Sequence, residues 1–168
     1  KDYAFLLQWL LDDPSLGMVF KPKRSGNLFQ RLSSISQLIE RAQSTGRCKF
    51  LLSEHHSGSI YPSEAALAAD VCVGLLSAPT AAFEARLADI PTLLIDTHLE
   101  PDHPILAWGR GQVVFDDWPA IRAGVEQYRA SPVSHAEFGD WRPGMGDFDP
   151  FQDGQGTLRM GQFIRWVY

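Results

Sequence analysis

Apolar residues recur along the chain at two spacings, one typical of buried strands and one typical of amphipathic helices. Short apolar runs without polar alternation predict strands covered on both faces, as in a parallel sheet. These expected strands are Met18–Phe20, Cys48–Leu52, Val71–Leu76, Thr92–Asp96 and Gln112–Phe115. Apolar residues three and four positions apart predict helices between and around the strands. These expected helices are Asp2–Leu11, Leu28–Gln43, Glu64–Ala69, Thr80–Ala88, Pro119–Arg129 and Thr157–Val167.

The alternation of strands and helices predicts an α/β fold. Such a pattern is typical of a doubly wound, three-layer sandwich with a mainly parallel sheet, here of about five strands. We assign residues 1–130 to this Rossmann-like domain. Residues 131–156 are rich in Gly, Pro and Asp, which predicts irregular structure. Because Trp141, Phe148 and Phe151 supply apolar anchors, we expect residues 131–168, including the last helix, to pack on the same domain.

The turn Ser77-Ala-Pro-Thr80 is the first candidate site. Right-handed crossovers place the loops after the parallel strands along one edge of the sheet, and this turn follows the third strand. Pro79 and Thr80 open a helix whose first N–H groups are unpaired and lie at the positive end of the helix dipole. A helix that begins directly after a buried parallel strand is suited to hold a phosphate. Glu84, one turn further on, could reach a sugar hydroxyl beside that phosphate.

Other polar residues follow the remaining strands at the same edge. The basic turn 21–24 contains Lys21 and Lys23, which could pair with phosphate oxygens or form a solvated turn. His98 follows the fourth strand and is placed for a substrate contact, although a lone histidine is more often structural. The polar loop 53–59 is expected to face solvent, with ligand contact by Glu54 or His55 as the alternative.

The composition and the absence of several known motifs exclude a number of function classes. The 168 residues suffice for one domain, and the net charge of −5 argues against a nucleic-acid binder. The chain has no phosphate-binding P-loop, dinucleotide fingerprint or serine-hydrolase elbow, and no zinc-type cysteine spacing. We therefore expect no metal and no cofactor. No apolar run approaches the roughly 20 residues that a membrane-spanning helix needs. Cys48 and Cys72 are interpreted as reduced core cysteines of a cytoplasmic protein.

The stretch Asp70–Pro91 resembles the C-terminal, donor-binding half of GT-B glycosyltransferases. The shared pattern is an aspartate, an apolar strand, a turn with Ser and Thr, a helix with Glu-Ala, and a proline before the next strand. A looser similarity extends over Met18–Phe115. The ending Asp149–Arg159 is similar to endings of bacterial surface-polysaccharide biosynthesis proteins.

The resemblance implies roles for individual residues and for partners. Ser77 and Thr80 would bind the donor diphosphate and Glu84 its ribose, while Lys21 or Lys23 would add positive charge and His98 would lie near the donor sugar. The partners would be a nucleotide-diphosphate sugar, a glycan or lipid-linked acceptor, and an N-terminal domain that carries the acceptor site and the catalytic base. The chain would then be a fragment of a longer enzyme, placed in the cytoplasm or at the inner face of the membrane.

The sequence departs from the family pattern in three respects. Leu76 stands where retaining members often carry a second glutamate, which favours inverting chemistry. Asp89-Ile90 replaces the small glycine before the strand proline. The family domain also has a strand ahead of its first helix. Without it, either Met18–Lys21 and Val71–Leu76 become neighbours, in the strand order 2-1-3-4-5, or a strand from outside the chain fills the gap.

Two further functions fit the same residues. A sugar-nucleotide epimerase of this architecture would use the same phosphate-binding turn but no acceptor. A non-catalytic, flavodoxin-like interaction module would use the sheet edge to bind a partner protein, and Ser77–Thr80 would then be an ordinary helix start.

Overall fold

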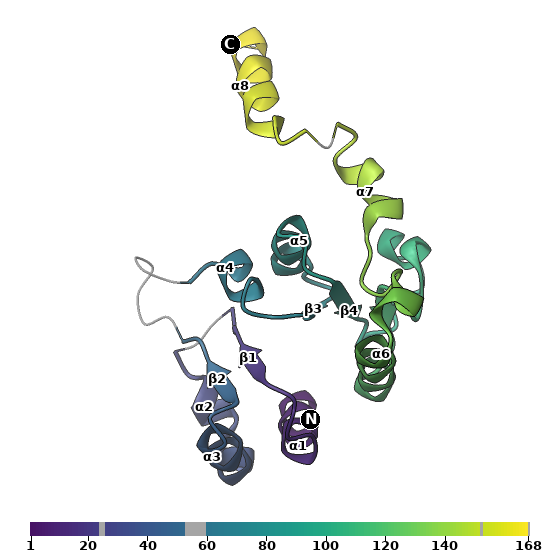
Figure 1. Cartoon of the computed structure of the whole chain (residues 1–168). Coiled ribbons are helices and arrows are strands. Elements are labelled where there is room, and N and C mark those ends of the chain that lie inside the picture. The colour runs from purple at the N-terminus through teal and green to yellow at the C-terminus, as the bar shows by residue number, and fades with distance from the viewer. Residues whose placement is uncertain (24–25, 53–59, 152, 168) are drawn as a thin grey trace.

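The five expected strands all form and pair in parallel, but they make two sheets instead of one (Figure 1). The computed structural model describes residues 1–23, 26–52, 60–151 and 153–167. One sheet joins β1 (Met18–Phe20) to β2 (Cys48–Phe50), and the other has the order β3 (Cys72–Leu75), β4 (Thr92–Ile95), β5 (Val114–Phe115). The α/β class with parallel pairing is therefore confirmed. The order 2-1-3-4-5 is wrong, because β1 and β3 do not pair.

Helices cover both faces of the strands. The α-helices are α1 (Asp2–Asp12), α2 (Leu28–Arg31), α3 (Ser36–Ser44), α4 (Pro62–Ala66), α5 (Thr80–Leu87), α6 (Trp118–Ala130), α7 (Arg142–Phe148) and α8 (Gly156–Val167). Short 3-10 helices span Ser33–Ile35, Pro104–Trp108 and Pro132–His135. Helix α1 contacts α3 and α6, whereas α4 contacts α5. On β4, Leu94 packs with Ala82 of α5 and its neighbour Leu93 packs with Ile121 of α6, so α5 and α6 lie on opposite faces.

Two segments differ from the expected secondary structure. The single helix expected over Leu28–Gln43 is broken into α2, a 3-10 turn at Ser33–Ile35, and α3. Ser33 and Ser34 stand at this break, and serine is a weaker helix former than the alanine and leucine that favour a continuous helix. The segment 131–156, expected to be irregular, contains the 3-10 turn Pro132–His135 and helix α7.

The C-terminal part of the chain divides into a buried and an exposed portion. Trp141 is fully buried, and α7 covers Trp108 so closely that a Cβ atom on Gly144 would lie 2.0 Å from the indole. Helix α8, in contrast, buries none of its residues and leaves Trp166 81% exposed. Figure 1 shows α8 projecting away from the strands. Among the described residues, none of α8 is buried, so the packing of α8 on the domain stays a prediction.

An acid-sensitive contact joins the end of α1 to α6. The Asp13 carboxylate accepts hydrogen bonds from the Ser15 hydroxyl at 2.6 Å and from the Arg129 guanidinium at 2.7 Å. These bonds, with the Ser15 hydroxyl first, lower the pKa of Asp13 from its ordinary value of 3.8 to about 2. Because the folded-state pKa is lowered, the contact stabilises the fold fully above pH 4 and is lost as the pH falls from about 4 to about 2.

We expect the acid limb of the pH–stability curve to become shallower when Asp13 is replaced by asparagine. The amide does not titrate, so the Asp13→Asn variant should lose no further stability at this position between pH 4 and pH 2. Urea unfolding across this range measures the slope. Asp102→Asn, at an exposed aspartate, is the matched control and should leave the slope as in the parent. Equal slopes for the parent and Asp13→Asn would contradict the assignment.

Candidate functional site

Helix α5 begins at the carboxyl end of β3 without a capping side chain. The Ala78 N–H donates to the Leu75 carbonyl at 3.2 Å, which closes the turn between strand and helix. The first helical hydrogen bond runs from the Phe83 N–H to the Pro79 carbonyl at 2.9 Å. No residue of the described ranges accepts a hydrogen bond from the N–H groups of Thr80, Ala81 or Ala82. These three donors, at the positive end of the helix dipole, can bind an anion.

A glycine in β3 allows α5 to lie close to the strand. A Cβ atom on Gly74 would lie 2.8 Å from the Cβ of Ala82, closer than carbon atoms pack. Ala82 and Ala85 are the buried residues of α5, so the helix meets the sheet through small side chains. The close approach fixes where the first turn of α5 sits relative to the strand end.

The substitution Gly74→Ala is expected to destabilise the fold by about 1–3 kcal/mol, because α5 must move away from β3. The same change should displace the first turn of α5 and weaken anything bound there. Urea unfolding measures the first effect. Gly161→Ala is the matched control, since it lies within α8 with nothing within 4 Å of its added Cβ and should leave the stability equal or slightly higher.

The polar side chains expected at this turn are free to contact a ligand. Ser77 and Thr80 are exposed, and Glu84 is half-buried one turn further along α5. In the described part of the chain, no hydrogen bond or ion pair engages the Glu84 carboxylate. His98 is exposed beyond β4. Because Leu75 is level with Ile95 in the parallel register, the chain segments that carry Ser77 and His98 leave adjacent strands at similar height.

The basic residues Lys21 and Lys23 follow a strand of the other sheet. This strand is β1, which belongs to the two-stranded sheet and not to the sheet of β3 that precedes Ser77. Glu54, His55 and the third basic residue of the 21–24 turn lie outside the described residues. Four of the expected site residues therefore lie in segments that follow strands of the three-stranded sheet: Ser77, Thr80, Glu84 and His98. The two lysines follow a strand of the two-stranded sheet.

Asp96 is a candidate site residue that the sequence analysis missed. It is 1% exposed at the end of β4, and its Oδ1 accepts a hydrogen bond from the Glu100 N–H at 3.2 Å. Its Oδ2 has no partner among the described residues. A buried carboxylate oxygen without a donor is costly, and such groups often belong to a binding site. The signal in the sequence was an acidic residue that ends an otherwise apolar strand.

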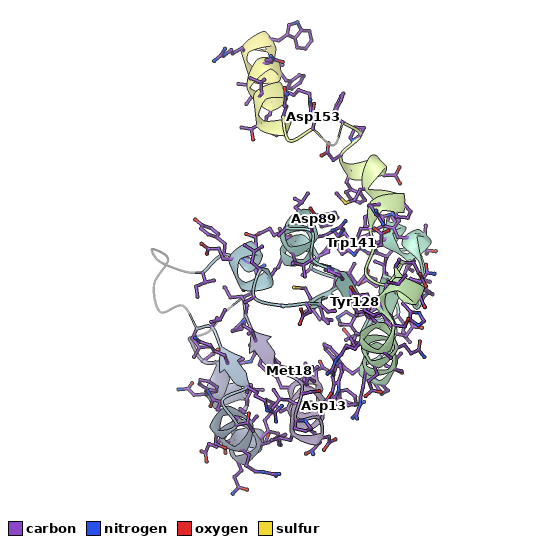
Figure 2. All side chains as sticks on the ribbon, in the orientation of Figure 1. Asp13, Met18, Asp89, Tyr128, Trp141 and Asp153 are labelled. Atoms are coloured by element: carbon purple, nitrogen blue, oxygen red, sulfur yellow. The ribbon has the colours of Figure 1, made fainter. Side chains whose placement is uncertain are left out.

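Asp89 ends helix α5 in an uncommon backbone conformation. Its backbone adopts the left-handed conformation, with φ of 61°, where α5 ends (Figure 2). The Ile90 N–H donates to the Ala85 carbonyl at 3.3 Å, as in a Schellman motif. Glycine is the residue that such a position favours, and aspartate is among the few others that tolerate it. Asp89 therefore ends α5 in a conformation that glycine adopts most readily.

The candidate site lies at the edge of the three-stranded sheet, where Ser77, Thr80 and His98 are exposed. Two hollows elsewhere measure about 520 Å³, around Ser33–Leu38, and about 340 Å³, between Arg86, Tyr128 and Arg142. Neither is lined by Ser77, Thr80, Glu84 or His98. Within the described ranges, no three His, Cys, Asp or Glu residues form a group that could hold a metal ion.

Comparison with known proteins assigns no family. No family model, curated protein or solved structure matches the chain. No helix in the described part of the chain has the length and apolarity needed to cross a bilayer.

Proposed function

We propose that the chain is the nucleotide-sugar-binding domain of a GT-B glycosyltransferase that acts in surface polysaccharide or glycan biosynthesis. The observation that carries this proposal is the uncapped first turn of α5, which lies beside the exposed Ser77 and Thr80 at the carboxyl end of β3. In open α/β folds this edge is where ligands bind, and a helix start of this kind favours a phosphate.

Each polar group has a role in the proposed complex. The N–H groups of α5 and the hydroxyls of Ser77 and Thr80 donate hydrogen bonds to the diphosphate. The Glu84 carboxylate accepts hydrogen bonds from the ribose hydroxyls, and His98 lies on the side of the donor sugar. Asp96 offers one further acceptor. Lys21 and Lys23 add positive charge from the neighbouring strand end, which requires the two sheets to act as one Rossmann-like sheet.

The reaction itself needs groups beyond these residues. In the proposed enzyme, an N-terminal domain supplies the catalytic base and the site for a glycan or lipid-linked acceptor, and the enzyme works in the cytoplasm at the inner face of the membrane. Leu76 at the position of the second family glutamate is consistent with inverting chemistry.

Calorimetric titration with UDP-, GDP- and CMP-linked sugars tests the proposal. We expect one of these nucleotides to bind and the other two to bind more weakly. Absence of binding by all three to the folded chain would reject the proposed function.

Two substitutions test the assigned roles. Thr80→Ala and Glu84→Ala should each weaken nucleotide-sugar binding by about 1–3 kcal/mol, because each removes a hydrogen bond to the ligand. Titration of each variant with the nucleotide that binds measures the loss. Thr157→Ala, at an exposed threonine in the first turn of α8, is the matched control and should bind as the parent does. Unchanged affinity in both test variants would refute the roles of Thr80 and Glu84.

A non-catalytic interaction module is the second candidate. The observation that favours it is the exposure of Ser77, Thr80 and His98, together with the position of the two measured hollows away from Ser77 and Thr80. This candidate predicts that the folded chain binds no nucleotide sugar, so the same titration separates the two functions.

A further inference from the structure

The hollow of about 340 Å³ lies away from the candidate site, at the other end of the strands. It is lined by residues at the end of α5, by Tyr128 of α6 and by residues between 132 and 142. Pro91, which precedes β4, also lines it, whereas the candidate site follows the carboxyl ends of β3 and β4. We call this hollow the Arg86 hollow, and Figure 2 labels Asp89 and Tyr128 among its lining residues.

The lining of the Arg86 hollow is mostly apolar and partly aromatic. The rings of Tyr128 and Phe138 stack, with their centroids 5.1 Å apart and an interplanar angle of 22°. Val133, which also lines the hollow, is 91% exposed and is therefore open to contact. Cavities of about 300–1,000 Å³ with a mostly apolar lining and a few polar groups are typical of small-molecule sites. The hollow therefore suits the apolar body of a small ligand.

The backbone at Gly139, which lines the Arg86 hollow, is held in place by hydrogen bonds to the sheet. The Gly139 N–H donates to the Gln112 carbonyl at 2.9 Å, and the Gly139 carbonyl accepts from the Thr92 N–H at 3.1 Å. Gly139 has φ of 66°, and a Cβ atom there would lie 2.6 Å from the Thr92 nitrogen, so the close approach requires glycine. This side of the hollow is thus formed in advance, which lowers the cost of ordering it around a ligand.

Arg86 is shielded from water and only weakly paired. Its side chain is 15% exposed, and its Nη1 donates a hydrogen bond at 3.2 Å to Oδ1 of Asp89. The Asp89 side chain is 94% exposed, so water screens this pair strongly. In the described part of the chain, the Arg86 guanidinium makes no other hydrogen bond. Because a guanidinium carries five N–H donors, Arg86 keeps donors for an anion.

The second carboxylate of the Arg86 hollow, Asp140, is bound by Arg142. The Arg142 Nε lies 2.9 Å from Asp140 Oδ1, and its Nη2 lies 2.9 Å from Oδ2. These hydrogen bonds lower the pKa of Asp140, and the nearby charge of Arg86 adds to the effect. Arg142 therefore balances the charge of Asp140, and the charge of Arg86 is left for a ligand. Because two aspartates lie nearby, a singly charged anion is favoured over a phosphate dianion.

We propose that the Arg86 hollow binds a small monocarboxylate with an aromatic or branched apolar body. The Arg86 guanidinium donates two hydrogen bonds to the carboxylate, a geometry that suits arginine, and the exposed Asp89 side chain gives way to the ligand. The apolar body packs against the rings of Tyr128 and Phe138. This site is separate from Ser77 and Thr80, so the inference does not depend on the proposed function.

Titration of the folded chain with 3-phenylpropionate tests the proposal, with binding followed by the amide NMR signals of Phe138 and Gly139. We expect saturable shifts of these signals at the millimolar concentrations that so small a ligand requires. The alcohol 3-phenylpropanol has the same body without the charge, and acetate has the charge without the body. Each should bind at least about 10-fold more weakly than 3-phenylpropionate.

Three variants assign the parts of the site. Arg86→Gln should weaken binding of 3-phenylpropionate by about 10-fold or more and leave that of 3-phenylpropanol unchanged. Arg41→Gln, at an exposed arginine of α3, is the matched control and should bind as the parent does. Ala136→Trp, at an exposed position that lines the hollow, fills it and should weaken binding of both ligands. If Arg86→Gln does not fold, Ala136→Trp still tests the site.

Three results would overturn the proposal. The first is the absence of saturable shifts at Phe138 and Gly139 in the folded parent chain. The second is parent-like affinity for 3-phenylpropionate in folded Arg86→Gln or in folded Ala136→Trp. The third is a set of shifts centred on Ser77 and Thr80, which would show that the carboxylate occupies the first turn of α5 instead of the Arg86 hollow.

Discussion

Replacing Trp141 with alanine is expected to lower the free energy of unfolding by about 3–5 kcal/mol, the largest effect among the substitutions considered. The side chain is fully buried, and its Nε1 donates a hydrogen bond at 2.7 Å to the carbonyl of Thr92, the first residue of β4. Its ring lies 4.9 Å from that of Phe83 and 5.4 Å from that of Trp108, centroid to centroid. Alanine leaves a cavity between α5 and the sheet and an unpaired buried carbonyl.

Urea unfolding followed by circular dichroism measures this loss, and two further variants separate its causes. Trp141→Phe keeps most of the volume but removes the hydrogen bond, so it should cost less than alanine does. Trp166→Ala, at a tryptophan that is 81% exposed in α8, should change the stability by less than about 0.5 kcal/mol. A loss below about 1 kcal/mol for Trp141→Ala would contradict the place of Trp141 in the core.

The second large effect is expected at Arg47, which closes the end of α1. Its Nη1 lies 3.0 Å from the carbonyl oxygen of Leu10 and 2.9 Å from that of Asp13, and it also donates to the carbonyl of Leu16. Helix ends leave carbonyls unpaired, and a positive charge at this end also opposes the helix dipole. Arg47→Met keeps a long side chain but no donor, so we expect a loss of about 3 kcal/mol.

Thermal and urea unfolding of Arg47→Met measure this effect. The matched control is Arg41→Met, because Arg41 is an exposed arginine of α3 whose guanidinium makes no hydrogen bond or ion pair in the described ranges. Arg47→Met should unfold at lower urea than both the parent and Arg41→Met. Equal midpoints for the two variants would show that Arg47 does not hold the segment from Leu10 to Leu16 in place.

Local patterns along the chain predict most of the elements that carry the site. Apolar runs locate all five strands, and the Pro-Thr pair locates the first residue of α5 at Thr80. Both signals are local, since strand burial and helix starts depend on a few neighbouring residues. The helix expected over 28–43 is broken at Ser33–Ile35, and the periodic apolar pattern, which continues across these residues, does not indicate the break.

The features that the sequence did not predict depend on distant contacts. β1 and β3 belong to different sheets because of which strands pair with one another. The spacing of apolar residues along the chain does not predict strand pairing. Asp96 becomes a candidate only because the three-dimensional structure buries it and leaves Oδ2 without a donor. The apolar stripe of α8 predicted packing, yet a stripe cannot say whether a facing element exists.

The division of the core has a consequence for folding. One cluster joins α1 and α3 to β1 and β2, and the other two surround β4 with α5, α6 and the tryptophans. Each set comes from a continuous stretch of the chain except near the N-terminus. There, Leu7 and Leu10 of α1 belong to the first cluster, Trp9 of α1 belongs to another, and Met18 of β1 packs against both. Residues near the N-terminus thus couple two cooperative units, and a chain emerging from the ribosome can complete the first unit before the second has been synthesised.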